Sequence, residues 1–408
     1  MRAEAIAIGT ELLTTSRVDT NSVWIAQRLA DLGLGFHRKT SVGDDRAELR
    51  NLFHEALDRS DLIVCTGGLG PTFDDFTKEL WAEVLGVSLV EDPISREAIE
   101  AFFRLRNRPC PPNNFKQAMV PAGAEALPNP VGTAPGIYWE HLPGYPATRL
   151  VLLPGVPREM KRMWEDQVEP RLRPLAGQPR HTLRMLVGSV GESALEQRTA
   201  PLRERHGQLD WTILAGLGQV ELVARSSHPE ALEAARRDFE AELGPDRICT
   251  GPQSLEETVL LRLASRGETL ALAESMTGGR IASLLTAVPG ASASFAGGAV
   301  VYSPKGKTEL AGLSPEALVV HGTVSEATTR ALAEGIRQRL GASWGLAVTG
   351  NAGPTEDPLG PAPAGTFHVA LAGPTGTVGE SQHFPGARQD VQARAASYAL
   401  DFLRRRLA

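Results

Sequence analysis

Two side chains that could hydrolyse an amide lie close together in the last third of the chain. Ser275 follows the apolar run 269–273 and precedes Thr277-Gly278-Gly279, a composition typical of a tight turn that opens a helix. A serine there can lie over backbone N–H groups that point outward from the helix start. Lys307 follows the next apolar run, with Tyr302 just before it. Lysine is a known base for a hydroxyl nucleophile, so this spacing indicates a serine–lysine pair.

The same serine also fits a structural role. A serine before a helix is most often an N-cap, and paired glycines allow close packing. The distribution of lysines favours chemistry, because the chain has only six of them and two, Lys305 and Lys307, follow one strand directly. A lysine desolvated in a pocket can accept the serine proton and return it to departing ammonia.

Composition limits the class of protein. The chain has 408 residues, 42% of them hydrophobic, and a net charge of −6, which predicts several globular domains and disfavours a nucleic-acid coat or a polybasic membrane binder. We expect a cytoplasmic protein without a signal peptide or membrane span. The nine histidines lack zinc-site spacing, and the three cysteines, which lack CxxC spacing, are expected to be reduced thiols: Cys65, Cys110 and Cys249.

The first 170 residues alternate strand-like and helix-like patterns. Ala5–Ile8 and Leu62–Cys65 read as strands, and Ala47–Leu57 reads as a helix. This alternation predicts an α/β domain with a mostly parallel sheet. Because sites in such sheets lie beyond the carboxyl ends of the strands, the motifs there become candidates. They are Gly9-Thr-Glu-Leu12, Gly43-Asp-Asp45 and Thr66-Gly-Gly-Leu-Gly-Pro-Thr72.

The third motif has the features of a phosphate site. Its glycines, 67, 68 and 70, let the backbone approach an anion, and a helix start follows. Asp74 and Asp75 suit a bare phosphate poorly, but they fit if Mg²⁺ or a similar divalent cation bridges carboxylate and phosphate oxygens. Lys78 lies nearby in sequence. The alternative is a loop with acidic helix-start residues, which the helix dipole favours in any case.

Two turn-rich links, Pro170–Pro179 and Gly244–Pro252, predict three domains with the bounds 1–170, 176–248 and 252–408. The middle one reads strand, helix, hairpin, helix, a β-α-β-β-α order that is KH-like. Between residues 176 and 248 the chain has nine arginines, no lysine and eleven acidic residues. That balance favours a linker or dimerisation module over nucleic-acid binding.

A series of short motifs in the last third resembles the carboxy-terminal domain of the CinA family, the nicotinamide mononucleotide deamidases. The motifs fall in one order: Ser275-x-Thr-Gly-Gly279, Pro289-Gly-Ala-Ser292, Gly297-Gly298, Tyr302-Ser303, Lys307, Val324-Ser325, and Val348-Thr-Gly350 with Ala352-Gly-Pro354. The resemblance implies an α/β deamidase domain that converts nicotinamide mononucleotide to nicotinic acid mononucleotide and ammonia, without a cofactor. This chain departs from the family pattern at Met276, where cysteine is usual, and at Asn351, where isoleucine is usual.

The resemblance also implies roles for individual residues. Ser275 would be the nucleophile, Lys307 its base, and Tyr302 an aid to proton transfer. Arg388 would contact the substrate phosphate, although it also reads as a solvated arginine at a helix start, where its charge opposes the dipole. The remaining residues expected in the pocket are Thr277, Gly278, Gly279, Gly298, Thr349 and Gly350.

The amino-terminal segment resembles CinA as well. The motifs are Gly9–Leu13, Asp19-Thr-Asn21, Gly67–Thr77, Asn129–Gly132 with Ala134-Pro-Gly136, and Leu153–Met160. The resemblance implies a fold similar to molybdopterin-binding proteins and hydrolysis of ADP-ribose to AMP and ribose 5-phosphate. Asp74 and Asp75 would lie near the metal. The expected nucleotide site comprises Glu11, Asn21, Asp44, Gly67, Gly68, Gly70, Thr72 and Lys78.

Two functions from different classes therefore compete. The first is a bifunctional hydrolase of pyridine nucleotide recycling, expected to act as a homodimer on nicotinamide mononucleotide and ADP-ribose. The second is an adaptor in DNA uptake or recombination, suggested by the family's link to competence and by the KH-like segment. Ammonia release from nicotinamide mononucleotide favours the first, and salt-sensitive DNA binding without turnover favours the second.

Overall fold

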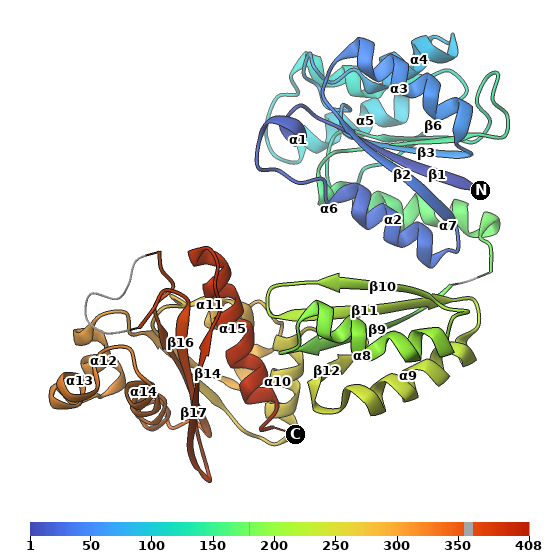
Figure 1. Cartoon of the computed structure of the whole chain (residues 1–408). Coiled ribbons are helices and arrows are strands. Elements are labelled where there is room, and N and C mark those ends of the chain that lie inside the picture. Colours follow the sequence, from blue (N-terminus) through green and yellow to red (C-terminus); the bar gives the residue numbers. More distant parts are fainter. Residues whose placement is uncertain (179, 355–361, 408) are drawn as a thin grey trace. The chain divides into compact units, whose positions relative to one another are not determined.

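The computed structural model describes residues 1–178, 180–354 and 362–407. The chain forms two compact units, Met1–Arg180 and His181–Ala408 (Figure 1). Within the described residues, none of the helices combines the length and the apolar character needed to cross a membrane.

A six-stranded sheet ordered β2-β1-β3-β8-β7-β6 forms the centre of the first unit. The four strands β2, β1, β3 and β8 pair in parallel, whereas β7 is antiparallel to both its neighbours. The predicted α/β domain with a mostly parallel sheet is therefore confirmed. The strands are β1 (Arg2–Ile8), β2 (Gly35–Val42), β3 (Leu62–Thr66), β6 (Glu125–Leu127), β7 (Gly136–Trp139) and β8 (Arg149–Leu153); β4 (Leu89–Glu91) and β5 (Met119–Pro121) pair as a separate ribbon.

Helices cover both faces of this sheet (Figure 1). Alternate residues of the buried strand β3 point to opposite layers, so Ile63 joins one core and Val64 the other. On the first face Phe53 stacks on Trp81 with ring centroids 4.0 Å apart, and on the second Trp24 meets Trp164 edge to face. The helices are α1 (Glu11–Thr14), α2 (Asn21–Asp31), α3 (Arg46–Arg59), α4 (Thr77–Leu85), α5 (Pro93–Arg104), α6 (Pro157–Met163) and α7 (Glu169–Leu172).

The second unit begins with an antiparallel sheet ordered β10-β11-β9-β12, covered by two helices. The predicted order of strand, helix, hairpin and helix is present. A fourth strand, β12, pairs with β9 and was not predicted. The likeness to KH domains remains a prediction. The elements are β9 (His181–Gly188), α8 (Glu192–Arg205), β10 (Asp210–Ala215), β11 (Gln219–Ser226), α9 (Pro229–Leu243) and β12 (Arg247–Thr250).

The rest of the second unit is a five-stranded sheet ordered β14-β13-β15-β16-β17, parallel across its first three strands and antiparallel across the others. A capping box of Ser254 and Glu257 starts its first helix. The strands are β13 (Leu270–Glu274), β14 (Phe295–Val300), β15 (Trp344–Gly350), β16 (Thr366–Gly373) and β17 (Gly376–His383). The helices are α10 (Leu255–Ser265), α11 (Arg280–Thr286), α12 (Pro304–Ala311), α13 (Pro315–His321), α14 (Glu326–Arg339) and α15 (Arg388–Arg404).

Two apolar cores enclose this sheet. The helices α10, α11 and α15 pack on one face, and α12, α13 and α14 pack on the other. Because β13, β14 and β15 are parallel, their carboxyl ends meet at one edge of the sheet. The residues that follow these strands include Ser275 and Tyr302, so the topology alone gathers the predicted motifs.

Candidate functional site

Ser275 lies directly after the buried strand β13. Its backbone N–H donates to the carbonyl of Val348 at 2.9 Å, so the neighbouring strand fixes the start of the turn. The turn continues through Gly278 and Gly279, whose φ angles of 63° and 93° suit glycine. Ser275 is only 5% exposed. The serine hydroxyl is therefore held in a dry, defined position.

Lys307, on α12, reaches this hydroxyl with its ammonium group. Its Nζ lies 3.1 Å from Ser275 Oγ and 3.0 Å from the carbonyl oxygen of Val301, and the residue is 2% exposed. Helix α12 positions it, because Ser303 caps that helix by accepting a hydrogen bond from Gly306 N–H at 3.1 Å. Lys305, two residues away, points to solvent and pairs with Glu309. The structure thus brings together the predicted serine and lysine.

Glu274 has a role that the sequence did not reveal. Its carboxylate accepts hydrogen bonds from the backbone N–H groups of Gly279, Ile281 and Ala282 at 2.8–3.2 Å. The N–H groups of the 277–279 turn, next to Ser275, are the first candidates for oxyanion donors. Two of them are already used, since Gly279 donates to Glu274 and Gly278 donates to the carbonyl of Ser275. The helix start is therefore closed by a protein carboxylate rather than open to an external anion.

Arg388 and Tyr302 form a second polar group within the same unit. Arg388 donates from Nη2 to the hydroxyl of Tyr302 at 3.1 Å and from Nη1 to the carbonyl of Gly353 at 2.7 Å. Both side chains are exposed, and that of Tyr302 is 63% accessible. The guanidinium at the start of α15 thus faces solvent, and it ties Tyr302 to the loop that follows β15.

The remaining predicted pocket residues have structural constraints of their own. Thr349 is fully buried, with its hydroxyl 2.7 Å from that of Thr329 on α14. A side chain at Gly298 would lie 2.8 Å from Leu272 Cβ, and one at Gly350 would lie 2.5 Å from Met276 Sδ. Both glycines are therefore required for close packing around β13 and its turn. Thr277 lies on the wall of a different cavity, described below.

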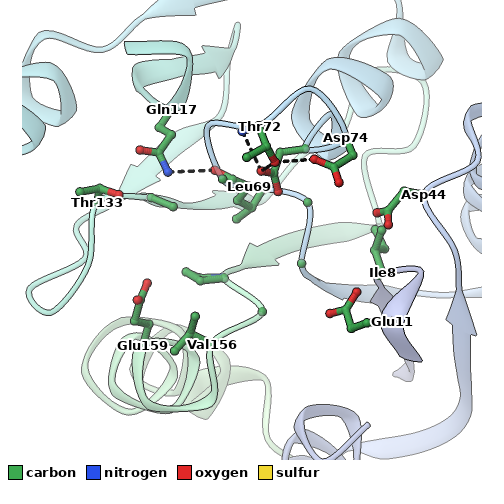
Figure 2. A pocket seen from close by; sticks show the side chains of 18 of the residues that line it. Ile8, Glu11, Asp44, Leu69, Thr72, Asp74, Gln117, Thr133, Val156 and Glu159 are labelled. Carbon is green, nitrogen blue, oxygen red and sulfur yellow. Dashed lines mark hydrogen bonds between the residues drawn. The ribbon is translucent and has the colours of Figure 1, made fainter. Parts of the chain in front are cut away.

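The first unit holds a cavity of about 490 Å³ over the carboxyl ends of its strands (Figure 2). Eight of the predicted residues line it: Glu11, Asp44, Gly67, Gly68, Gly70, Thr72, Asp74 and Asp75. The glycines allow the loop to run close to its surroundings, because a Cβ at Gly67 would meet the carbonyl oxygen of Ile8 at 2.1 Å. Asn21 lines an adjoining cavity of about 380 Å³ that shares Glu11 and Arg17 with the first.

Thr72 organises the acidic part of the loop. Its hydroxyl bonds the carboxylates of both Asp74 and Asp75, and its N–H donates to Asp75 Oδ2 at 3.0 Å (Figure 2). The hydrogen bond from Thr72 holds the pKa of the Asp74 carboxyl below its ordinary value, with help from the backbone and Lys116. The ionised form of the Asp74 carboxyl is thus favoured. Each aspartate accepts these bonds through one oxygen, Asp74 through Oδ1 and Asp75 through Oδ2.

The part of the chain that the structure describes contains no cluster of three or more His, Cys, Asp and Glu side chains able to hold a metal. This result does not conflict with Mg²⁺, which usually takes one or two protein carboxylates and completes its shell with water and substrate phosphates. Asp74, with Asp44 and Glu11 on the same wall, fits that pattern. The donor set fits a cation that arrives with a phosphorylated substrate.

Lys78 does not line this cavity. It is 2% exposed and donates to the carbonyls of Gln117 and Lys116 at 2.7 and 3.3 Å. Burial lowers its pKa to about 8. Lys116 instead supports the loop, because its ammonium donates to the carbonyls of Thr72 and Asp75. Sequence reasoning did not assign Lys116, and it also left out Arg17, Gln117, Thr133 and Glu159, which line the cavity.

Comparison with known proteins matches both ends of the chain. Residues 252–407 match the family described as "CinA C-terminal domain", and residues 4–174 match "Probable molybdopterin binding domain". A "CinA-like protein" of Acidobacterium capsulatum is 41% identical over 417 residues, covering 100% of both chains. Another, from Anaeromyxobacter sp. (strain K), is 42% identical over 409 residues, covering 99% of each.

Solved structures are similar to part of the chain. One is the protein CinA with unknown function from Thermoplasma acidophilum, which is 35% identical, covers 41% of this chain and 96% of its own, and has a TM-score of 0.38. Another is a competence-damaged protein (CinA) superfamily protein from Klebsiella pneumoniae 700603, which is 32% identical, covers 38% of this chain and 98% of its own, and has a TM-score of 0.36.

Proposed function

Because the chain belongs to the CinA family, we propose that its second unit deamidates nicotinamide mononucleotide to nicotinic acid mononucleotide and ammonia. The observation that carries this proposal is the buried pair of Ser275 and Lys307, 3.1 Å apart. A hydroxyl needs a base to attack an amide, and burial disfavours the charged form of a lysine, which leaves its amine able to accept a proton.

The proposed reaction balances with these two groups and one water. Lys307 Nζ takes the hydroxyl proton as Ser275 Oγ bonds to the carboxamide carbon. The tetrahedral intermediate collapses by breaking the C–N bond, and Lys307 returns the proton to the departing ammonia. Water, deprotonated by Lys307, then attacks the ester and releases the acid and the serine hydroxyl. Among the backbone donors near Ser275, the N–H groups of Met276 and Thr277 are used in no hydrogen bond with other described residues. They are the donors we assign to the oxyanion.

Arg388 is the group that we assign to the substrate phosphate. It is an exposed cation in the same unit, linked through Tyr302 to the segment that leads from Val301 into α12. A guanidinium bound to a phosphate is worth about 1.5–3 kcal/mol, or roughly 10–100-fold in binding.

The first unit is proposed to hydrolyse ADP-ribose to AMP and ribose 5-phosphate. What supports this is the cavity with a glycine-rich loop, Asp74 and Asp75, and further carboxylates on its wall. Asp74 would hold a divalent cation, whose bound form neutralises phosphate charge and polarises the P–O bond. Gly67, Gly68 and Gly70 would let backbone N–H groups approach the diphosphate, while Lys116 keeps the loop in place.

Incubation of the full chain with each nucleotide tests both activities, with products identified by mass spectrometry. The deamidase proposal predicts nicotinic acid mononucleotide and an equal amount of ammonia. Nicotinamide riboside, which lacks the phosphate, should react with a KM about 10–100-fold higher, and Arg388→Gln should abolish this preference. Equal KM values for the two substrates would remove Arg388 from its assigned role. Salt-sensitive DNA binding without turnover would favour an adaptor instead.

A further inference from the structure

A cavity of about 560 Å³ lies behind the serine turn, in the second unit. Its wall combines the β10–β11 hairpin, the starts of α10 and α11, and the middle of α15; Figure 1 shows the labelled helices α11 and α15 side by side. The hairpin closes on α15 at Gly218, where an added Cβ would come within 2.9 Å of Ser397 Cβ. Neither Ser275, Lys307 nor Arg388 lines this cavity. The cavity therefore adjoins the proposed deamidation site through the serine turn, whose residues Thr277, Gly278 and Gly279 line it.

Three residues of this wall carry buried polar atoms without hydrogen-bond partners among the described residues. The atoms are Thr277 Oγ1, Ser397 Oγ and Gln219 Oε1. Thr277 and Ser397 are only 4% and 7% exposed. An unsatisfied buried polar group costs about 1–3 kcal/mol, and folded proteins leave few of them. Three around one cavity indicate that hydrogen bonds are completed there by something other than the chain.

The wall also carries two charges that are unpaired within the described parts of the chain. Arg280, the first residue of α11, and Glu256, in the first turn of α10, are both half-buried and form no ion pair there. The N–H groups at the start of α11 are occupied by Glu274, so the guanidinium is the anion-binding group on this wall. Glu256 can accept hydrogen bonds from hydroxyl groups, and it disfavours ligands with several negative charges close together.

We propose that this cavity binds a small phosphorylated sugar, with its phosphate on Arg280 and its hydroxyl groups on Thr277, Ser397, Gln219 and Glu256. The single positive charge of Arg280 suits one phosphate group, and the oxygen atoms of the four polar side chains suit the hydroxyl groups of a sugar. The ligand would contact the serine turn directly, since Thr277 is part of that turn. Gln392 strengthens the link by donating from Nε2 to the carbonyl of Met276 at 2.7 Å. Neither proposed activity is needed for this binding.

Hydrogen–deuterium exchange of the full chain, read by mass spectrometry, tests the site without relying on turnover. Millimolar ribose 5-phosphate should slow exchange several-fold in peptides covering residues 276–284 and 393–400. Inorganic phosphate should protect 276–284 more weakly, and ribose alone should have little effect. Protection in the first unit would report separately on the proposed nucleotide site.

Three variants make the result specific. Arg280→Gln should abolish the protection, and Ser397→Ala, which removes one hydroxyl, should weaken it; unliganded exchange elsewhere should match that of the original chain, which shows that both fold. Arg388→Gln should leave the protection unchanged. The proposal is overturned if 276–284 shows no slowing, if Arg280→Gln keeps it, or if Arg388→Gln removes it. Equal protection by inorganic phosphate would also refute recognition of the sugar.

Discussion

Replacing Lys307 by methionine separates chemistry from folding at the proposed catalytic pair. Methionine keeps most of the apolar stem, and this matters because the residue is 2% exposed and packs inside the unit. It cannot accept the proton of Ser275, whose Oγ lies 3.1 Å from Nζ. Loss of a general base costs about 10²–10⁴ in rate, or roughly 3–5 kcal/mol of transition-state stabilisation.

The assay is ammonia release from nicotinamide mononucleotide, compared with the thermal unfolding of each variant. Lys305→Met is the matched control, because Lys305 pairs with Glu309 at the surface and should keep full activity. If serine and lysine act as a unit, Ser275→Ala combined with Lys307→Met should be no slower than either single variant. Near-normal ammonia release by a folded Lys307→Met, or a larger loss from Lys305→Met, would refute the serine–lysine mechanism.

Four further outcomes test other parts of the account. EDTA should abolish ADP-ribose cleavage and spare deamidation; equal loss of both would show that the metal assignment to Asp74 is wrong. Lys78→Met should remove a pH dependence of unfolding. The pKa of Lys78 is about 8 in the folded chain and ordinarily 10.5, so between these pH values the unfolded chain binds more protons. As pH rises through this range, the free energy of unfolding of the original chain should increase by up to about 3 kcal/mol relative to that of the variant. A difference between the two chains that stays constant from pH 7 to 11 would contradict this. Gly298→Ala should lower the free energy of unfolding by about 1–3 kcal/mol, since the added Cβ would lie 2.8 Å from Leu272 Cβ. An unchanged urea denaturation midpoint would show that β13 and β14 separate at little cost. A fragment from His181 should deamidate nicotinamide mononucleotide normally. One from Gly251 should melt at a lower temperature, because the buried Arg404 loses the carbonyls of Arg247 and Pro245 that it bonds at 3.0 and 2.6 Å; equal melting temperatures would exclude this dependence.

The sequence predicted the serine–lysine pair because local patterns and topology agree there. An apolar strand, a glycine turn and a capped helix are each visible in short stretches, and parallel pairing of β13 with β14 brings their carboxyl ends together. The glycine loop of the first unit was predicted for the same reason. Its residues are contiguous, so no long-range contact had to be known.

Features that depend on side-chain direction or distant contacts were not predicted. Lys78 lies four residues after Asp74, yet its position on α4 turns it towards the carbonyl of Gln117, and Lys116 supports the loop from far along the chain. Glu274 was not singled out by the sequence, although its carboxylate bonds to the start of α11. Strand β12 has only four residues between turn-forming segments and read as a linker.

The most direct test of the central claim is ammonia release from nicotinamide mononucleotide by the full chain and by Ser275→Ala. The original chain should release ammonia and nicotinic acid mononucleotide in equal amounts. The folded Ser275→Ala variant, which lacks only one buried hydroxyl, should release neither above background. Unchanged release by Ser275→Ala, or no release by the original chain, would contradict the central claim.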